Sequence, residues 1–242
     1  MLKIYAAIDL FNGRVARLVK GMQDNVTYYP LSPLDYAKRW VEEGADWLHV
    51  IDLNAALGTG NNLELIKNIV REVKNPVQVG GGVRSLEYAS ALLDAGATRV
   101  IISSIFFTNR EEARKILTTY GAEHVIIALD SDSSGTVVIK GWKEKTQLKL
   151  HELLPEVLKF GFNEVLVTDI SRDGTLMGVD GGFLNLIPEK MRGHVIVAGG
   201  ISRIGDILML SKLGFAGAVL GKALYENVLS VSTALKALSV ER

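Results

Sequence analysis

The stretch that decides the fold is Val77-Gln78-Val79-Gly80-Gly81-Gly82-Val83-Arg84, and it returns 118 residues later as Val195-Ile196-Val197-Ala198-Gly199-Gly200-Ile201-Ser202. Each copy is a short apolar strand that ends in a glycine turn and leads into an amphipathic helix. A second strand with small residues at its end follows, Arg99–Ser103 in the first copy and Gly217–Gly221 in the second. Glycine at a strand end lets backbone N–H groups approach an anion, and the start of the next helix adds a favourable dipole. The repeat therefore predicts two phosphate sites, and a substrate with two phosphates.

The two glycine turns assign residues to the predicted phosphate sites. The first site comprises Gly81, Gly82, Ser103 and Ser104, and the second comprises Gly199, Gly200, Gly221 and Lys222. A tight turn without a ligand also uses glycine, and it is the duplication at both strand pairs that favours phosphate binding. Arg17, Lys20 and Arg84 are expected to add positive charge near these sites, the alternative for each being an ordinary surface position.

Eight short segments are continuous in Val, Ile, Leu and Ala rather than alternating, which is typical of parallel strands covered on both faces. They are Ile4–Ile8, Trp47–Ile51, Val77–Val79, Arg99–Ser103, Val125–Leu129, Glu164–Thr168, Val195–Ala198 and Gly217–Gly221. Helical periodicity fills the intervals at 33–43, 62–73, 85–95, 109–119, 148–160, 181–190, 203–213 and 224–238. Units of about 30 residues are usual for such strand–helix pairs. The chain is therefore predicted to be one α/β domain over residues 1–242, a (βα)8 TIM barrel.

The internal repeat also predicts that the barrel consists of two homologous half-barrels, residues 1–120 and 121–242. Trp47–Leu53 parallels Glu164–Ile170, so the similarity extends beyond the glycine turns. A doubly wound open sheet is the alternative architecture. It is the weaker one, because an open sheet does not predict two equivalent halves of four units.

Composition limits the partners. The 27 basic and 27 acidic residues cancel, and no basic stripe is interleaved with aromatic residues, so nucleic acid is not expected as a partner. No apolar run approaches the ~18 residues of a membrane span, so no membrane association is expected. The lack of cysteine excludes disulfides and thiolate metal sites and is typical of a cytoplasmic protein. We expect a cytoplasmic monomer.

Acidic residues follow several of the predicted strands. In a TIM barrel the catalytic groups project from the carboxyl ends of the strands, where Asp9, Asp52, Asp130 and Asp169 lie. An aspartate at such a position often only caps the following turn, and Asp52 and Asp169 fit that role because a polar, glycine-containing loop follows each. Asp9 and Asp173, from strands one and six, are predicted on opposite sides of the barrel mouth. A substrate could be held there between a base and an acid.

Other kinds of chemistry receive little support. The four histidines, His49, His124, His151 and His194, are not spaced as metal ligands, and for His49 and His124 we expect packed or solvent-facing positions. There is no nucleophile elbow, no P-loop lysine motif and no dinucleotide fingerprint after the glycines. No metal and no cofactor are therefore expected, which leaves proton chemistry on a phosphorylated sugar. Trp142 is predicted to be a lid or a stacking platform for an aromatic ring.

Together these residues resemble the phosphoribosylformimino-aminoimidazole carboxamide ribotide isomerase family of histidine biosynthesis. The resemblance is carried by Ala7-Ile8-Asp9-Leu10, Gly13-Arg14-Val15, His49-Val50-Ile51-Asp52-Leu53, Gln78–Arg84, Lys140-Gly141-Trp142, Val167–Leu176 and Gly221–Tyr225, which span almost the whole chain. It implies a barrel of two half-barrels and a substrate with a phosphate at each end. It also implies an isomerase that needs no cofactor and carries out an Amadori rearrangement of an aminoaldose to an aminoketose.

The resemblance also implies roles for individual residues. Asp9 is expected to be the general base that removes the C2′ proton, and Asp173 the general acid that opens the ribose ring. Asp130 and Thr168 are expected to assist in the active site, and Trp142 to stack on the carboxamide-imidazole. General acid–base catalysis of this kind contributes ~10²–10⁴-fold to a rate.

Three alternative functions are compared with this one. The cyclase subunit of imidazole-glycerol-phosphate synthase shares the half-barrels but usually has Cys-Leu-Asp in the first strand, whereas this chain has Ala7-Ile8-Asp9 and no cysteine. A bifunctional enzyme that also isomerises phosphoribosylanthranilate remains open, because Asp9, Arg17 and Trp142 are compatible with both substrates. A non-catalytic phosphate-binding barrel is disfavoured by the presence of both Asp9 and Asp173.

Overall fold

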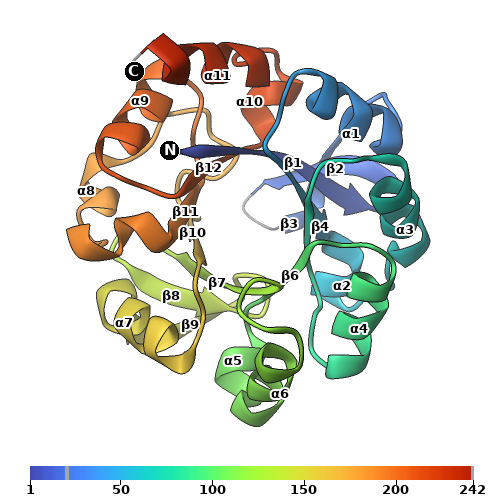
Figure 1. Cartoon of the computed structure of the whole chain (residues 1–242), viewed down its shortest axis with the longest axis vertical. Helices are drawn as coiled ribbons and strands as arrows, with labels where there is room; N and C mark the ends of the chain where they lie inside the picture. The colour runs from blue at the N-terminus through green and yellow to red at the C-terminus, as the bar shows by residue number, and fades with distance from the viewer. Residues whose placement is uncertain (20–21, 241–242) are drawn as a thin grey trace.

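The central feature of the molecule is a closed ring of parallel strands surrounded by helices (Figure 1). The computed structural model describes residues 1–19 and 22–240, and in that part of the chain eight parallel strands pair around the ring. In spatial order they are β1 (Lys3–Phe11), β4 (Trp47–Asp52), β5 (Val77–Gly80), β6 (Arg99–Ile102), β7 (Val125–Ser131), β10 (Val165–Asp169), β11 (Val195–Ala198) and β12 (Gly217–Leu220). The ring closes where β12 pairs in parallel with β1, Gly217 opposite Lys3. The predicted TIM barrel is confirmed, and each predicted strand overlaps one of these eight.

The outer layer consists of helices that follow the barrel strands. The longer ones are α1 (Pro33–Glu42), α3 (Leu63–Glu72), α4 (Leu86–Asp94), α6 (Arg110–Tyr120), α7 (Leu150–Phe160), α9 (Ile204–Lys212) and α11 (Val231–Val240). The short helices are α2 (Leu53–Leu57), α5 (Ile105–Thr108), α8 (Gly181–Leu184), α10 (Lys222–Tyr225) and the 3-10 helix η1 (Glu189–His194). Side chains from the helices and from the outward face of the strands form the larger hydrophobic core.

Two predicted helices differ from the structure. The helix expected at 181–190 ends at Leu184, and Pro188 precedes a separate 3-10 turn. Proline lacks an N–H and disfavours helical backbone in the residue before it, so one helix cannot run through this position. The helix expected at 224–238 is divided into α10 and α11 near Asn227, whose φ of 54° is left-handed. Asparagine tolerates this conformation better than most residues.

Two antiparallel hairpins were not predicted, and both extend from the carboxyl ends of barrel strands. The first is β2 (Arg14–Val19) with β3 (Met22–Tyr28), and the second is β8 (Thr136–Ile139) with β9 (Glu144–Lys149). The turn from β1 into β2 is Asn12-Gly13, with φ values of 50° and 75°. Asn-Gly is the strongest short-range hairpin signal, because a two-residue turn of this type needs positive φ at both positions. Lys20, one of the basic residues predicted near the mouth, lies outside the described residues.

A second, smaller core fills the barrel interior. Its buried members come from the inward faces of the strands: Tyr5, Ala7, Ile101, Ile126, Ala128, Leu166, Ile196, Ala198 and Val219. Because alternate residues of a strand point to opposite faces, the same strands contribute to both cores. The packed interior leaves the carboxyl ends of the strands as the place where polar side chains can converge.

Backbone packing also requires glycine in the two turns. Gly81 and Gly199 have φ values of 97° and 98°, and a Cβ atom would come within 2.2 Å of the Asp52 carbonyl oxygen at Gly81 and 2.4 Å of the Asp169 carbonyl oxygen at Gly199. Each turn therefore packs its backbone directly on the loop that follows the preceding strand. Such paired contacts are what the duplication of residues 1–120 and 121–242 leads us to expect, and the two half-barrels stay a prediction.

Replacing Gly199 by alanine should lower the free energy of unfolding by about 2 kcal/mol or more, because the new methyl group meets backbone and the left-handed φ becomes strained. Denaturant unfolding measures the change. Gly205→Ala is the matched control, since Gly205 lies in α9 with open space where its Cβ would be. That control should raise the free energy of unfolding by about 0.5 kcal/mol. Equal stability of the two variants would contradict the packing described for Gly199.

Candidate active site

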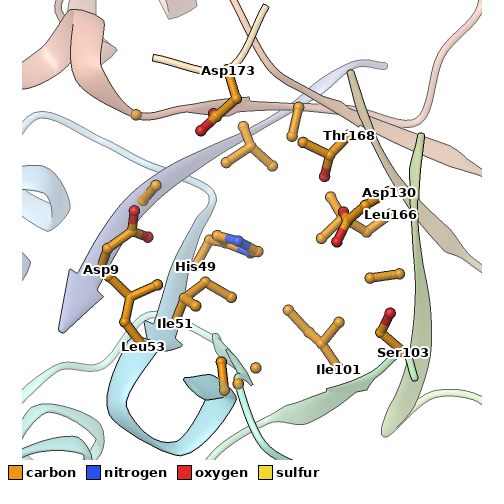
Figure 2. Close-up of a pocket in the computed structure, with 18 of the residues that line it drawn as sticks. Asp9, His49, Ile51, Leu53, Ile101, Ser103, Asp130, Leu166, Thr168 and Asp173 are labelled. Atoms are coloured by element: carbon orange, nitrogen blue, oxygen red, sulfur yellow. The ribbon is translucent and has the colours of Figure 1, made fainter. Parts of the chain in front are cut away.

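A cavity of about 260 Å³ opens at the carboxyl ends of the barrel strands. Figure 2 shows side chains from strands around the whole ring converging on it. Apart from Lys20, which lies outside the described residues, the site residues predicted from the sequence all line this cavity: Asp9, Arg17, Gly81, Gly82, Arg84, Ser103, Ser104, Asp130, Trp142, Thr168, Asp173, Gly199, Gly200, Gly221 and Lys222. The structure therefore brings together groups that lie as far apart in the sequence as the first and last strands.

Arg17 joins the two carboxylates predicted to be the base and the acid. Its Nη1 donates to Asp9 Oδ2 at 2.5 Å, and its Nη2 donates to Asp173 Oδ1 at 3.0 Å and Oδ2 at 3.2 Å. The three side chains are largely buried, with 12%, 13% and 19% of the side chains of Arg17, Asp9 and Asp173 exposed. The β2 hairpin strand supplies the arginine, β1 supplies Asp9, and Asp173 lies in the loop after β10. One guanidinium thus spans the part of the mouth between β1 and β10.

The electrostatics of Asp9 suit a proton acceptor. Burial raises the pKa of Asp9 above its ordinary value, the charge of Arg17 lowers it, and the neighbouring Asp173 raises it again, with a net upward shift. A carboxylate in water is a weak base, and a raised pKa strengthens it towards the range in which general bases work.

Asp130, Thr168 and Trp142 form a second group on the other side of the cavity. Trp142 Nε1 donates to Asp130 Oδ2 at 2.9 Å from the turn of the β8–β9 hairpin, where Trp142 has a left-handed φ of 67°. Burial raises the pKa of Asp130, while hydrogen bonds from Thr168 and Trp142 lower it and Asp173 raises it. Figure 2 shows Asp130 and Thr168 next to each other on the side of the cavity away from Asp9. The tryptophan predicted as a lid or platform therefore donates an indole hydrogen bond to a carboxylate of the site.

The predicted phosphate residues differ in how their side chains are used. The Ser104 hydroxyl accepts an N–H from Lys140 at 2.8 Å, which leaves its own proton free to be donated. Arg84 is exposed at the rim, and its Nη2 donates to the Ala56 carbonyl oxygen at 2.7 Å. At Gly221 a Cβ atom would come within 3.1 Å of Arg17 Nη1. Glycine at the end of β12 therefore keeps room for the arginine between the two carboxylates.

His49 is a residue of the site that the sequence analysis did not include. His49 is packed, as the sequence allowed, with only 6% of it exposed, and it also lines the cavity, which the sequence did not indicate. Figure 2 shows its ring reaching from β4 towards the centre of the cavity. Burial, and then the charges of Arg17 and Arg99, lower the pKa of His49 to about 3, so the imidazole is neutral. The signal that could have found it is strand alternation, since Ile51, two residues on, also points inward.

The two aspartates predicted as caps have that role. Asp52 is completely buried, its Oδ1 accepts the N–H of Ala55 at 3.1 Å, and its Oδ2 accepts the N–H of Asn62 at 2.6 Å. Asp169 Oδ1 accepts the N–H of Ser171 at 3.0 Å. Both carboxylates are engaged by the loop that follows their strand, as the sequence predicted.

Comparison with known proteins shows the family of this chain. The profile of the family described as histidine biosynthesis protein matches residues 3–230. The chain belongs to this family. A relative from Cenarchaeum symbiosum is 38% identical over 234 residues, which cover 97% of this chain and 99% of the relative. One from Nitrosopumilus maritimus is 39% identical, covering 96% and 98%, and one from Methanocaldococcus jannaschii is 37% identical, covering 96% and 98%.

The relatives carry one name. All three are isomerases of a 1-(5-phosphoribosyl)imidazole-4-carboxamide that bears a (5-phosphoribosylamino)methylideneamino group at position 5. The family recognised from the sequence motifs is therefore confirmed. Within residues 1–19 and 22–240, no three or more His, Asp or Glu side chains are grouped so that they could hold a metal ion. None of the helices described has the length and apolar character needed to cross a membrane.

Trp142→Phe should raise the pKa of Asp130 further, because the indole N–H that stabilises the carboxylate is removed while burial persists. The carboxyl carbon of Asp130, followed by NMR during a pH titration, measures the shift. Asp180 is the internal control, since Arg172 and backbone N–H groups bind its carboxylate away from the indole. An unchanged titration of Asp130 would show that the hydrogen bond from Trp142 has no effect on its charge.

Proposed function

We propose that this chain catalyses the aldose–ketose isomerisation of the phosphoribosylformimino-aminoimidazole carboxamide ribotide aminoaldose to its phosphoribulosyl aminoketose, without a cofactor. The observation that carries the proposal is the pair of largely buried carboxylates, Asp9 and Asp173, which bind the two terminal nitrogens of Arg17 at the barrel mouth. The reaction needs a group that gives a proton to the sugar and a group that takes one, and a carboxyl can do either according to its protonation state. The names of the relatives support the same reaction.

The proposed substrate has a phosphate at each end. The first glycine site follows β5 and β6, and the second follows β11 and β12, which lie across the barrel from them in the strand order. Each site offers backbone N–H groups at a strand end, and Lys222 adds a cation to the second one. A substrate held at both ends crosses the mouth over Asp9, Asp173 and Asp130. Such positioning converts a difficult encounter into an intramolecular one.

The proposed reaction adds as many protons to the substrate as it removes. Asp173 gives a proton to the ring oxygen as the bond from that oxygen to C1′ breaks, and the lone pair of the substituent nitrogen forms an iminium at C1′. Asp9 removes the proton from C2′, and the electron pair of the C–H bond forms an enolamine. A proton added to C1′ and another lost from the C2′ hydroxyl complete the aminoketose. Aldose and ketose are isomers, so no oxidant or reductant is consumed.

The remaining residues of the site support these steps in the proposal. Trp142 covers the mouth and offers an indole face to the imidazole carboxamide, since aromatic faces prefer offset stacking on other rings. Asp130 and Thr168 bind hydroxyl groups of the opened sugar. A cytoplasmic location and a monomeric state stay predictions, which fractionation and size-exclusion chromatography would test.

Asp9→Asn keeps the shape of the side chain but removes the base, so kcat should fall by ~10²–10⁴-fold. The kcat of Asp173→Asn should fall by a similar factor, because no carboxyl group is then present to protonate the ring oxygen. Steady-state kinetics on the aminoaldose, together with binding of the aminoketose to each variant, separate lost chemistry from lost binding. We expect binding to persist.

Asp94→Asn is the matched control, because Asp94 is an exposed aspartate at the end of α4. It should retain wild-type kcat. The same assay with the phosphoribosylanthranilate substrate decides between one activity and two. Wild-type protein that leaves the imidazole aminoaldose unchanged would overturn the proposed function, and near-normal kcat in Asp9→Asn would overturn the assignment of the base.

Arg17→Met should shift the acidic limb of the kcat/KM profile to higher pH. Asp9 acts when ionised, so activity is lost as pH falls through its raised pKa. Arg17 lowers that pKa, and removing the guanidinium lets burial and Asp173 raise it further. Arg14→Met, an exposed change on the same strand, is the control and should leave the limb in place. An Arg17→Met profile that coincides with the wild-type one would contradict the coupling between Arg17 and Asp9.

A further inference from the structure

A chain of buried polar side chains runs beneath the cavity and ends at His49. Arg99, at the first position of β6, donates from Nε and Nη2 to Gln78 Oε1 at 2.9 and 2.7 Å. Gln78 is completely buried on β5, and its Nε2 lies 2.5 Å from His49 Nδ1 on β4. His49 in turn reaches into the cavity (Figure 2). The chain thus connects the amino-terminal end of the barrel with the site at its carboxyl end.

The Arg99 end of the chain is held firmly. Its Nη1 is paired with Glu164, its Nη2 donates to the Tyr5 hydroxyl at 3.0 Å, and its guanidinium lies 4.2 Å from the centre of the Trp47 ring. Only 4% of Arg99 is exposed. A guanidinium has donors and no acceptor, and it stays protonated. The atom of Gln78 that faces Arg99 must therefore be the amide oxygen.

The direction of the remaining hydrogen bond follows from this orientation. With the amide oxygen of Gln78 directed to Arg99, the amide nitrogen faces His49 and donates to it. His49 Nδ1 must then be the acceptor, without a proton of its own. A neutral imidazole carries its single proton on the other nitrogen, Nε2.

We infer that Gln78 and Arg99 are positioning residues, which hold His49 as the neutral tautomer with its proton on Nε2 so that it donates a hydrogen bond to an oxygen of the substrate. The inference rests on the proposed function for the identity of the substrate and on the geometry of the three side chains for the tautomer. His49 supplies a neutral donor at a place where the charges of Arg17 and Arg99 oppose a charged one. The hydrogen bond made by one ring nitrogen of a histidine sets which of the two nitrogens carries the proton.

Two features oppose the alternative states of the imidazole. An imidazolium would direct the Nδ1 proton at the Gln78 amide protons, and it would add a third positive charge beside Arg17 on β2 and Arg99 on β6. The tautomer with its proton on Nδ1 makes the same clash and loses the donor in the cavity. Each state requires the Gln78 amide to turn its oxygen away from Arg99, which breaks both hydrogen bonds between them.

The first test reads the tautomer of His49 in wild-type protein. Nitrogen NMR distinguishes Nδ1–H, Nε2–H and imidazolium forms, and the sequence has only four histidines to assign. The His49 signals are identified by their loss in His49→Asn. We expect the Nε2–H form without titration between about pH 5 and 8. A wild-type His49 that is protonated on Nδ1, or charged at neutral pH, would overturn the inference.

The second test changes the direction of the hydrogen bond with Gln78→Glu. A carboxylate beside Arg99 can only accept from His49, so Nδ1 must take a proton and the pKa of His49 must rise. At low pH the imidazolium still donates from Nε2, whereas at higher pH the neutral Nδ1–H form does not. The variant should therefore lose about 10-fold in kcat/KM as pH rises through this new pKa. Gln147→Glu, the same change at an exposed position on β9, should add no such limb.

Two further results distinguish a positioning role of Gln78 from a structural one, and failure of this inference from failure of the proposed function. Gln78→Met removes the amide without adding charge, so the NMR should show a mixture of tautomers, and a uniform Nε2–H form in this variant would overturn the role of Gln78. A purely structural role would lower stability in both variants without creating the pH limb. Absence of isomerase activity in wild-type protein would overturn the proposed function, while the NMR spectra decide the tautomer whatever the activity.

Discussion

The site depends on one ionic contact, in which the Arg17 guanidinium binds Asp9 with one nitrogen and Asp173 with another. Two carboxylates at the same mouth, each less than one-fifth exposed, would otherwise repel each other and lose hydration. The guanidinium offsets the repulsion through charge-assisted hydrogen bonds and fixes the direction in which each carboxylate points. Gly221 leaves the space that this arginine occupies. Both carboxyl groups can therefore face the same substrate from one mouth.

The barrel holds this contact in place, because its packed apolar interior supports the strands while the polar groups lie at their carboxyl ends. Its interior is packed with apolar side chains in the middle and closed below by Arg99 with Tyr5 and Trp47. Polar groups are left at the carboxyl ends of the strands, and the two hairpins bring Arg17 and Trp142 over them. Strand β1 holds Asp9 and the loop after β10 holds Asp173, while strand β2 positions Arg17 and the left-handed turn of the second hairpin positions Trp142. A fold of this kind accommodates a large substrate while its catalytic groups stay fixed.

Periodicity was sufficient to predict the eight strands, because buried parallel strands are continuous in apolar residues and the loops between them contain glycine. The hairpins were missed because their strands are short and each hairpin mixes apolar with charged residues, although Asn12-Gly13 carried a recognisable signal for the turn from β1 into β2. Two features of the site could be predicted because they directly follow predicted strands. These are the strand-end aspartates and the glycine turns. The partners of Arg17 could not, since Asp173 is 156 residues away in the chain. The place of His49 in the site could not be predicted for the same reason, because its partners Gln78 and Arg99 come from other strands.

The most direct measurement is a single-turnover reaction of the wild-type protein with the aminoaldose carrying deuterium at C2′. The claim under test is that a carboxylate takes that hydrogen as a proton. We expect slower conversion than with ordinary substrate, because the C2′ bond to hydrogen breaks, and we expect deuterium to pass at least in part to water from the carboxyl that received it. Complete retention of the deuterium at C1′ of the aminoketose, together with conversion by Asp9→Asn at the wild-type rate, would contradict this mechanism, because the hydrogen would then have moved without the carboxylate.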